Sequence, residues 1–140
     1  MISQLKTEFY DILANELEYN VTDNPYGEEV KTFPYVLLTL QDTHRDVRKN
    51  SYLYEIKFKI DIFSEYSGEK EIFDMEQAIF DKSKRLLDND FVSYYRESAF
   101  RIIDDKATGV MRKHGIITYT IYCAGGIEEH VEDDNLQTHE

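Results

Sequence analysis

Three side chains that could bind a metal ion alternate within one short stretch of the sequence, Asp42, His44 and Asp46. Alternate residues of an extended chain point to the same side, so the three could meet at one edge of a hairpin. A second group of such residues lies near the C-terminus: His130, Asp133, Asp134 and His139. Both groups belong to polar segments, where such residues gather in water, and a metal site also needs outer residues that orient its ligands. We therefore expect no metal site and no other cofactor.

Motifs that would indicate catalysis do not occur in this sequence. Gly125 and Gly126 stand alone, and neither a GxGxxG pattern nor a Walker phosphate loop is present. No nucleophile lies in a recognisable elbow, and a catalytic triad cannot be inferred from separated residues. The single cysteine, Cys123, excludes an internal disulfide and offers no spacing for a zinc or iron–sulfur site. We expect a protein that is not an enzyme.

One cluster of cations runs against an acidic background. The chain carries a formal net charge of −12, yet Arg45, Arg48 and Lys49 lie close together, next to His44. Two interpretations stay open: a solvated turn protected from aggregation, or a surface that docks on an acidic partner or faces DNA in a lumen. We take these four residues as candidate partner-binding residues. Sequence-specific binding of nucleic acid is not expected, because the net charge would repel phosphates.

The element next to this cluster is a long strand from Ser51 to Phe63. Its even positions are all large and apolar, and charged residues fill most of the positions between them. This period of two predicts a strand with one buried and one wet face. The apolar positions are Tyr52, Tyr54, Ile56, Phe58, Ile60 and Ile62. The strand is more than twice the usual length of about 5 to 6 residues, so we expect it to project from the body as part of a long hairpin.

The other elements flank this strand. An amphipathic helix is predicted from Ile2 to near Tyr19 and Asn20, followed by a loop and a strand over 35–40. Residues 41–50 are too polar for a core and are predicted to form the tip of the hairpin. A second helix follows Ser64 and Ser67, either of which could cap it. Its inner positions are Ile72, Met75, Ile79, Ser83 and Leu86.

Two further strands are predicted after the second helix, over 100–105 and 116–123, and the stretch 91–99 is ambiguous. The order α-β-β-α-β-β with two antiparallel hairpins predicts an α+β fold, a single mostly antiparallel sheet with helices packed on it.

The C-terminal segment differs in composition from the rest. Residues 126–140 contain six acidic residues and no Lys or Arg, and they carry −6 of the net charge. We expect a single domain over 1–125 and a disordered, solubilising tail over 126–140. No segment approaches the roughly 18 apolar residues of a membrane span, and the N-terminus does not resemble a signal peptide. We expect a soluble, intracellular protein.

Taken together, these segments resemble the tail terminator, or tail completion, family of long-tailed bacteriophages. The resemblance covers about residues 1–125 and rests on the N-terminal helix, the strand 35–40, the long strand ending Ile60-Asp61-Ile62-Phe63-Ser64, the helix beginning Gly68-Glu69-Lys70-Glu71-Ile72, and the strand Ile116-Ile117-Thr118-Tyr119-Thr120-Ile121. The family has no catalytic motif, so the match is one of element order and texture. The acidic tail is not part of the pattern.

The resemblance implies a structural function. Proteins of this family form hexameric rings on the last ring of tail-tube subunits, stop tube growth and present a surface to the head connector. It implies assembly in the host cytoplasm and a final place at the tail–head junction of the virion. By the same resemblance, residues 41–50 would face the tube or its lumen, and sheet edges would pair between neighbouring copies. The composition leaves two alternatives open: another head–tail connector or neck protein, and an acidic inhibitor that mimics DNA.

Overall fold

The computed structural model describes residues 2–24, 33–47, 51–105 and 112–126. The elements in chain order are α1 (Ile2–Glu16), β1 (Asn20–Thr22), β2 (Tyr35–Val47), β3 (Ser51–Ser64), α2 (Lys70–Ser83), the 3-10 helix η1 (Lys84–Asp88), β4 (Val92–Asp105) and β5 (Arg112–Gly126). The strands form one sheet in the order β1-β2-β3-β5-β4. Of the described pairs, β1–β2 is parallel and the other three are antiparallel. The predicted α+β fold is confirmed, and strand β1 is an addition to the predicted order.

The core lies between the two helices and one face of the sheet. Each helix contributes an apolar stripe that is fully buried: Leu5, Phe9 and Leu13 from α1, and Ile72, Met75 and Ile79 from α2. The Phe9 ring packs edge to face on Phe58 of β3 at 5.5 Å and on Tyr119 of β5 at 5.7 Å. The predicted alternation of β3 is confirmed, because its even positions from Tyr52 to Ile62 are all buried.

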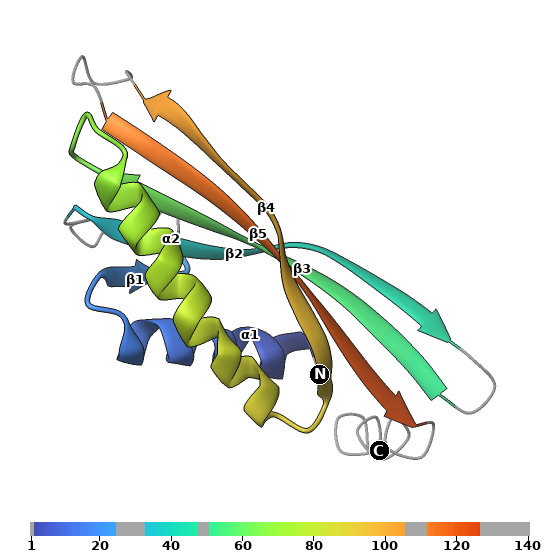
Figure 1. Cartoon of the computed structure of the whole chain (residues 1–140). Helices are drawn as coiled ribbons and strands as arrows, with labels where there is room; N and C mark the ends of the chain where they lie inside the picture. Colours follow the sequence, from blue (N-terminus) through green and yellow to red (C-terminus); the bar gives the residue numbers. More distant parts are fainter. Residues whose placement is uncertain (1, 25–32, 48–50, 106–111, 127–140) are drawn as a thin grey trace.

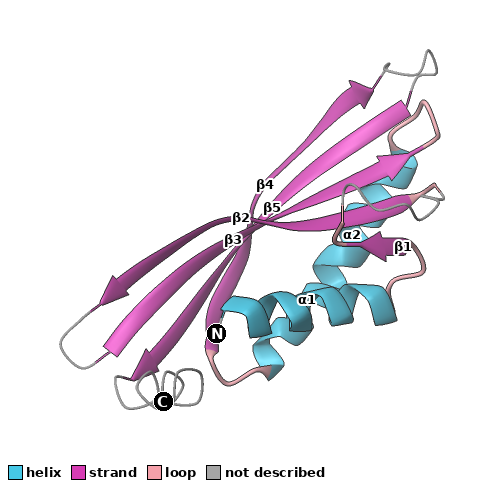
Figure 2. Ribbon diagram, turned by 180° about the vertical axis from the view of Figure 1, so that it is seen from behind, coloured by secondary structure: helices cyan, strands magenta, loops and turns pink. Residues whose placement is uncertain are grey.

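The helices cover only part of the sheet. Figure 1 shows a twisted sheet with α1 and α2 over one half of one face, while β2, β3 and β5 continue past them. The view from behind in Figure 2 shows the same overhang. We call the outer part of the β2–β3 hairpin, residues 41–57 without the undescribed 48–50, the arm. The predicted long, projecting hairpin is therefore confirmed.

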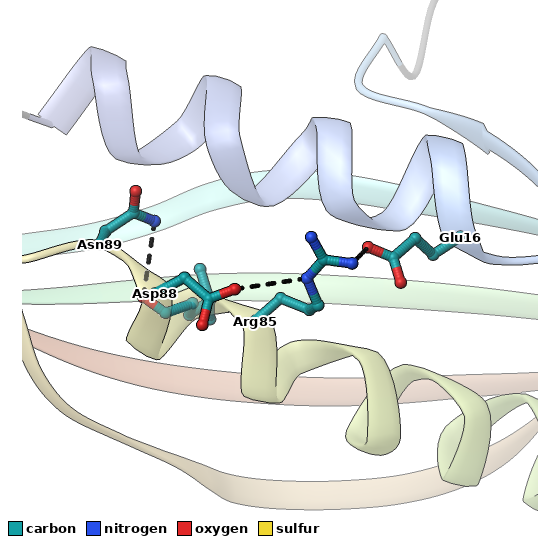
Figure 3. Close-up of polar contacts among 5 residues, drawn as sticks. Glu16, Arg85, Asp88 and Asn89 are labelled. Carbon is teal, nitrogen blue, oxygen red and sulfur yellow. Dashed lines mark hydrogen bonds and ion pairs between the residues drawn. The ribbon is translucent and has the colours of Figure 1, made fainter.

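A polar clamp joins α1 to the turn that ends α2. The Arg85 guanidinium in η1 pairs with Glu16 at the end of α1, and its Nε lies 3.4 Å from the Asp88 carboxylate (Figure 3). The Asn89 side-chain amide donates to the Leu86 carbonyl at 3.5 Å in the same turn. These contacts connect the end of α1 to the turn that follows α2.

The segment after Leu40 differs from the prediction. Residues 41–47 are not loop but the second half of β2, paired with β3 as far as Val47 opposite Tyr52. Every side chain from Leu40 to Val47 is exposed, so no apolar alternation marks this part of the strand. Pairing of its backbone with β3 stabilises it instead, and such pairing leaves no trace in composition.

Other helix and strand boundaries also differ from the predicted ones. Helix α1 ends at Glu16, before Tyr19, because residues 20–22 turn back to pair with β2 as the short strand β1. Strand β4 takes in almost all of the ambiguous stretch 91–99, beginning at Val92, and β5 extends from Arg112 to Gly126. The strands are longer than their apolar cores because pairing with neighbours continues into polar sequence.

Neither candidate serine caps α2. The helix follows Glu69, which makes no side-chain cap bond. Ser64 is the buried last residue of β3, where its hydroxyl donates to the Glu71 carboxylate at 2.6 Å and accepts from the Tyr66 amide at 3.1 Å. The predicted inner stripe of α2 is confirmed, and it continues into η1 with buried Leu86. The predicted acidic tail lies outside the described residues, except Gly126, which ends β5.

Candidate assembly surfaces

A β-bulge at the root of the arm decides which way its side chains face. The pairing of β2 with β3 shifts register between Leu40 and Asp42, so Gln41 is an extra residue. Before the bulge, Leu38 lies opposite buried Ile60 on the helix side of the sheet. After it, Arg45 lies opposite buried Tyr54, also on the helix side. The bulge therefore turns the odd residues of the arm toward the helix side.

The described candidate partner-binding residues, Arg45 and His44, therefore face opposite sides of the sheet. The Arg45 guanidinium carbon lies 5.1 Å from the centroid of the Tyr54 ring, within the range of a cation–π contact. His44 lies opposite Glu55 and faces the open side of the sheet. Arg48 and Lys49 lie outside the described residues. The two described members are thus on opposite faces and do not form one patch.

The described residues leave strand edges open on both sides of the sheet. β4 is the last strand on one side over its whole length, Val92–Asp105. On the other side β1 covers β2 only from Tyr35 to Leu37. Each such edge presents backbone N–H and C=O groups to an incoming strand. Two bulges in β4, between Val92 and Tyr94 and between Glu97 and Ala99, interrupt its pairing with β5.

A groove of about 700 Å³ runs between α2 and the first half of β4. Its rim carries three exposed apolar side chains, Phe80 of α2, Leu87 of η1 and Tyr94 of β4. The remaining lining includes Tyr95 and two acids, Glu76 from α2 and Glu97 from β4. Apolar side chains around a few polar groups are typical of a binding surface.

The two acids of the groove, Glu76 and Glu97, interact with each other. Burial first, and then the hydrogen bond with Glu76 and the like charge of Glu76, raise the pKa of Glu97 from its ordinary value of 4.5 to about 7. The hydroxyl of buried Tyr119 donates to Glu97 at 3.4 Å. Burial also raises the pKa of Tyr119. The described lining of the groove therefore contains an acidic pair and one cation, Arg96.

The open face of the sheet carries a stack of rings. The stack is formed by Tyr35, Phe63 and His114, which lie in neighbouring strands. The ring centroids of Tyr35 and Phe63 are 4.4 Å apart, those of Phe63 and His114 are 4.3 Å apart, and the ring planes are nearly parallel. His114 Nε2 lies 2.7 Å from the Asp61 carboxylate. The Asp61–His114 pair therefore lies beside the stacked rings, and these contacts stabilise this face of the sheet. Within the described ranges, no three His, Cys, Asp or Glu side chains come together as metal ligands, and Asp42, His44 and Asp46 are no exception.

The sequence pointed to Arg45 but not to the groove. Glu76 and Glu97 lie in different elements, and residues 93–97 fell in the ambiguous stretch, so no local spacing could bring them together. The sequence also did not indicate that the odd residues of the arm face the helix side. This depends on the bulge at Gln41, which is one polar residue among many.

Comparisons with known proteins add little to this geometry. No family model matches the chain, and no curated protein matches it in sequence. Among solved structures, a chain from the virion of a native gene transfer agent particle is similar over 89% of this chain and 92% of that chain, with 16% identity and a TM-score of 0.42. In the part of the chain that the structure describes, no helix is long and apolar enough to cross a membrane.

Proposed function

We propose that this chain is a structural assembly protein of a phage-like particle, and that its copies join edge to edge in a ring that caps a tail tube and stops its growth. The observation that carries the proposal is the pair of open strand edges on opposite sides of one sheet, in β2 and β4. In a head-to-tail contact, one surface of each copy binds a different surface of the next copy. Such a contact generates a closed ring when the rotations from copy to copy add up to a full turn.

The direction of the strands favours such a contact. β2, β3, β5 and β4 alternate in direction across the sheet, so β2 and β4 run in opposite directions. A rotation about an axis along the strands therefore brings β2 of one copy antiparallel to β4 of the next. Antiparallel pairing then continues from copy to copy around the ring. A sheet with an odd number of alternating strands would instead meet its neighbour in parallel.

The resemblance to tail terminators supplies the finer role. In this proposal the ring has six copies, one side binds the tail tube protein and the other binds the head–tail connector. The protein assembles in the host cytoplasm and ends at the tail–head junction, and it performs no catalysis. The predicted tip, with Arg48 and Lys49, faces the tube in this proposal, because these are clustered cations in a chain with net charge −12.

Light scattering with size-exclusion chromatography and negative-stain microscopy test the proposal. We expect rings from the protein alone at high concentration, and rings at the ends of tail tubes after mixing. A protein that stays monomeric and never binds tube ends would overturn it. Rings that bind connectors but leave tubes free would instead make the chain a neck protein, and inhibition of a DNA-binding enzyme that fades with salt would make it a DNA mimic.

A charge variant then tests the tip. Arg48→Ser with Lys49→Ser should leave rings intact and reduce the fraction of capped tubes, since it removes two cations from the tip. Lys6→Ser with Lys70→Ser removes the same charge from the two helices, outside the proposed strand edges, and is the matched control. Equal capping by the two variants would remove the tip from tube recognition.

A further inference from the structure

We propose that the groove between α2 and β4 receives the arm of a neighbouring copy of this chain, and that Arg45 of the arm pairs with Glu76 and Glu97. The inference rests on the proposed ring, and it names the surfaces that make each contact. Three observations on the isolated chain support it: the height of the arm along the sheet, the side that Arg45 faces, and the charges of the two surfaces.

The arm and the groove lie at the same height in the sheet. Cross-strand partners form rows across the four long strands, and two rows contain arm residues. One row is Thr43, Ile56, Ile121 and Tyr95, and another is Arg45, Tyr54, Cys123 and Val92. In copies at equal height, arm residues 43–45 lie beside residues 92–95 of the next copy, and Leu40 lies beside Glu97. The pairing of Arg45 with Glu97 therefore includes a stagger of about four residues between copies, of the kind that tilted strands impose when a sheet closes. Residues 93–97 are the strand wall of the groove.

Arg45 also faces the required side. It lies on the helix side of the sheet, as Tyr95 and Glu97 do, because the partners Tyr54, Ile121 and Tyr119 are buried under the helices. When a sheet is continued by an added strand, each face continues as the same face. The bulge at Gln41 is what makes this possible, since without it Arg45 would face the open side.

The two surfaces complement each other in charge and polarity. Among the described residues Arg45 contacts the Tyr54 ring and forms no ion pair, while the groove is lined by two carboxyl groups and one cation, Arg96. Arg96 alternates with Tyr95 and Glu97 along β4 and so faces the other side of the sheet. Val47, two residues beyond Arg45 on the same side, is 64% exposed and would meet the exposed apolar side chains Phe80 and Leu87 of the groove. A guanidinium between two carboxylates makes charge-assisted hydrogen bonds, which are stronger than neutral ones.

The proposed pairing makes assembly depend on pH. The titratable and charged groups around Glu97 are Glu76 from α2, Tyr119 from β5 and Arg96 of its own strand. In the free chain the pKa of Glu97 is about 7, and an incoming guanidinium would lower it. Association below that pH then releases a proton. Ring assembly should therefore weaken as pH falls below 7, by up to about tenfold for each pH unit.

Cross-linking tests which surfaces meet. Cys123 is buried, and burial raises its pKa to about 11, so the natural thiol gives little background. A variant with Arg45→Cys and Gln77→Cys places thiols on the arm and in the groove. A short bismaleimide should then give a ladder that ends in closed rings. Arg45→Cys with Asp11→Cys, where Asp11 is an exposed residue of α1, is the matched control and should give no ladder.

Charge exchange tests the role of Arg45. Arg45→Glu should raise the concentration at which rings form by at least about tenfold. Adding Glu76→Arg to the same chain exchanges both partners at every contact and should restore rings. Circular dichroism of the variants at low concentration checks that each is folded.

The outcomes separate the two proposals. A ladder from the 45–77 pair together with rescue by the double exchange supports the inference. Rings that persist in Arg45→Glu and give no ladder from the 45–77 pair overturn the inference and leave the proposed ring standing. A wild-type protein that never forms rings, alone or on tubes, overturns both.

Discussion

The Asp61 carboxylate lies 2.7 Å from His114 Nε2 on the sheet face that the helices leave open, yet only 4% of Asp61 is exposed. His114 stacks on Phe63, which stacks on Tyr35, so the pair lies beside three rings in a row. Lys59 Nζ is 3.8 Å from the same carboxylate. The expectation that odd positions of β3 form a wet face is wrong at Asp61, because cross-strand neighbours cover it.

Replacement of this carboxylate should cost stability. Asp61→Ala leaves the His114 side chain and the Lys59 ammonium without their common partner, and we expect a loss of about 1–3 kcal/mol. Urea unfolding at neutral pH measures it. Lys57→Ala, on the same face of β3 but outside the stack, should change stability by less than about 0.5 kcal/mol. Equal effects of the two substitutions would mean that the pair contributes nothing.

The two faces of β3 can be compared by placing one charge on each. Ile60 is fully buried under the helices, so Ile60→Asp should unfold the chain or cost more than about 4 kcal/mol. Lys59→Asp places the charge one residue away on the open face, where it loses the ion pair with Asp61, and should cost about 1 kcal/mol. Thermal unfolding followed by circular dichroism distinguishes the two, and similar losses would contradict the facing of β3.

Gly115 lets α2 approach the sheet closely. A Cβ at this position would lie 2.7 Å from Ile62 Cγ1 and 3.2 Å from Ile72 Cγ2. Gly115→Ala therefore forces these buried side chains apart and should cost about 1–3 kcal/mol. Gly68→Ala is the matched control, since nothing lies within 4 Å of its added methyl group. Denaturant midpoints of the two variants measure the difference, and a stabilised Gly115→Ala would show that α2 can move.

The parts of the fold that sequence predicted are those where one face is buried. The even positions of β3 and the stripe of α2 were readable because Ile60, Phe58 and Met75 must leave water. Residues 41–47 were not readable, since both faces of that strand are exposed and backbone pairing alone stabilises it. Strand β1 was not predicted either, because it is only three residues long and lies among turn-forming residues.

The candidate site was predicted only in part. The sequence indicated Arg45 through its charge, which contrasts with the acidic chain whatever the fold. The facing of Arg45 depends on the bulge at Gln41, and the groove depends on α2 lying beside β4. Both are results of tertiary packing that no local pattern encodes.

The acidic pair of the groove should make the stability of the monomer depend on pH. Burial first, and then Glu76, raise the pKa of Glu97 to about 7 in the folded chain, above its ordinary value of 4.5. A carboxyl group whose pKa is raised by folding stabilises the fold below its ordinary pKa and loses that contribution as pH rises through the folded value. The wild-type chain should therefore lose stability between about pH 5 and pH 8 from this group.

The variant Glu97→Gln isolates that loss. It keeps a neutral partner for Glu76 and cannot ionise, so its melting temperature relative to wild type should rise steadily from about pH 5 to about pH 8. The measurement is made at concentrations too low for rings, which keeps assembly out of the comparison. Glu65→Gln, at an exposed turn far from the groove, is the control and should follow wild type at every pH. If Glu97→Gln follows wild type as well, then folding does not raise the pKa of Glu97, and an arriving Arg45 would have no proton to release.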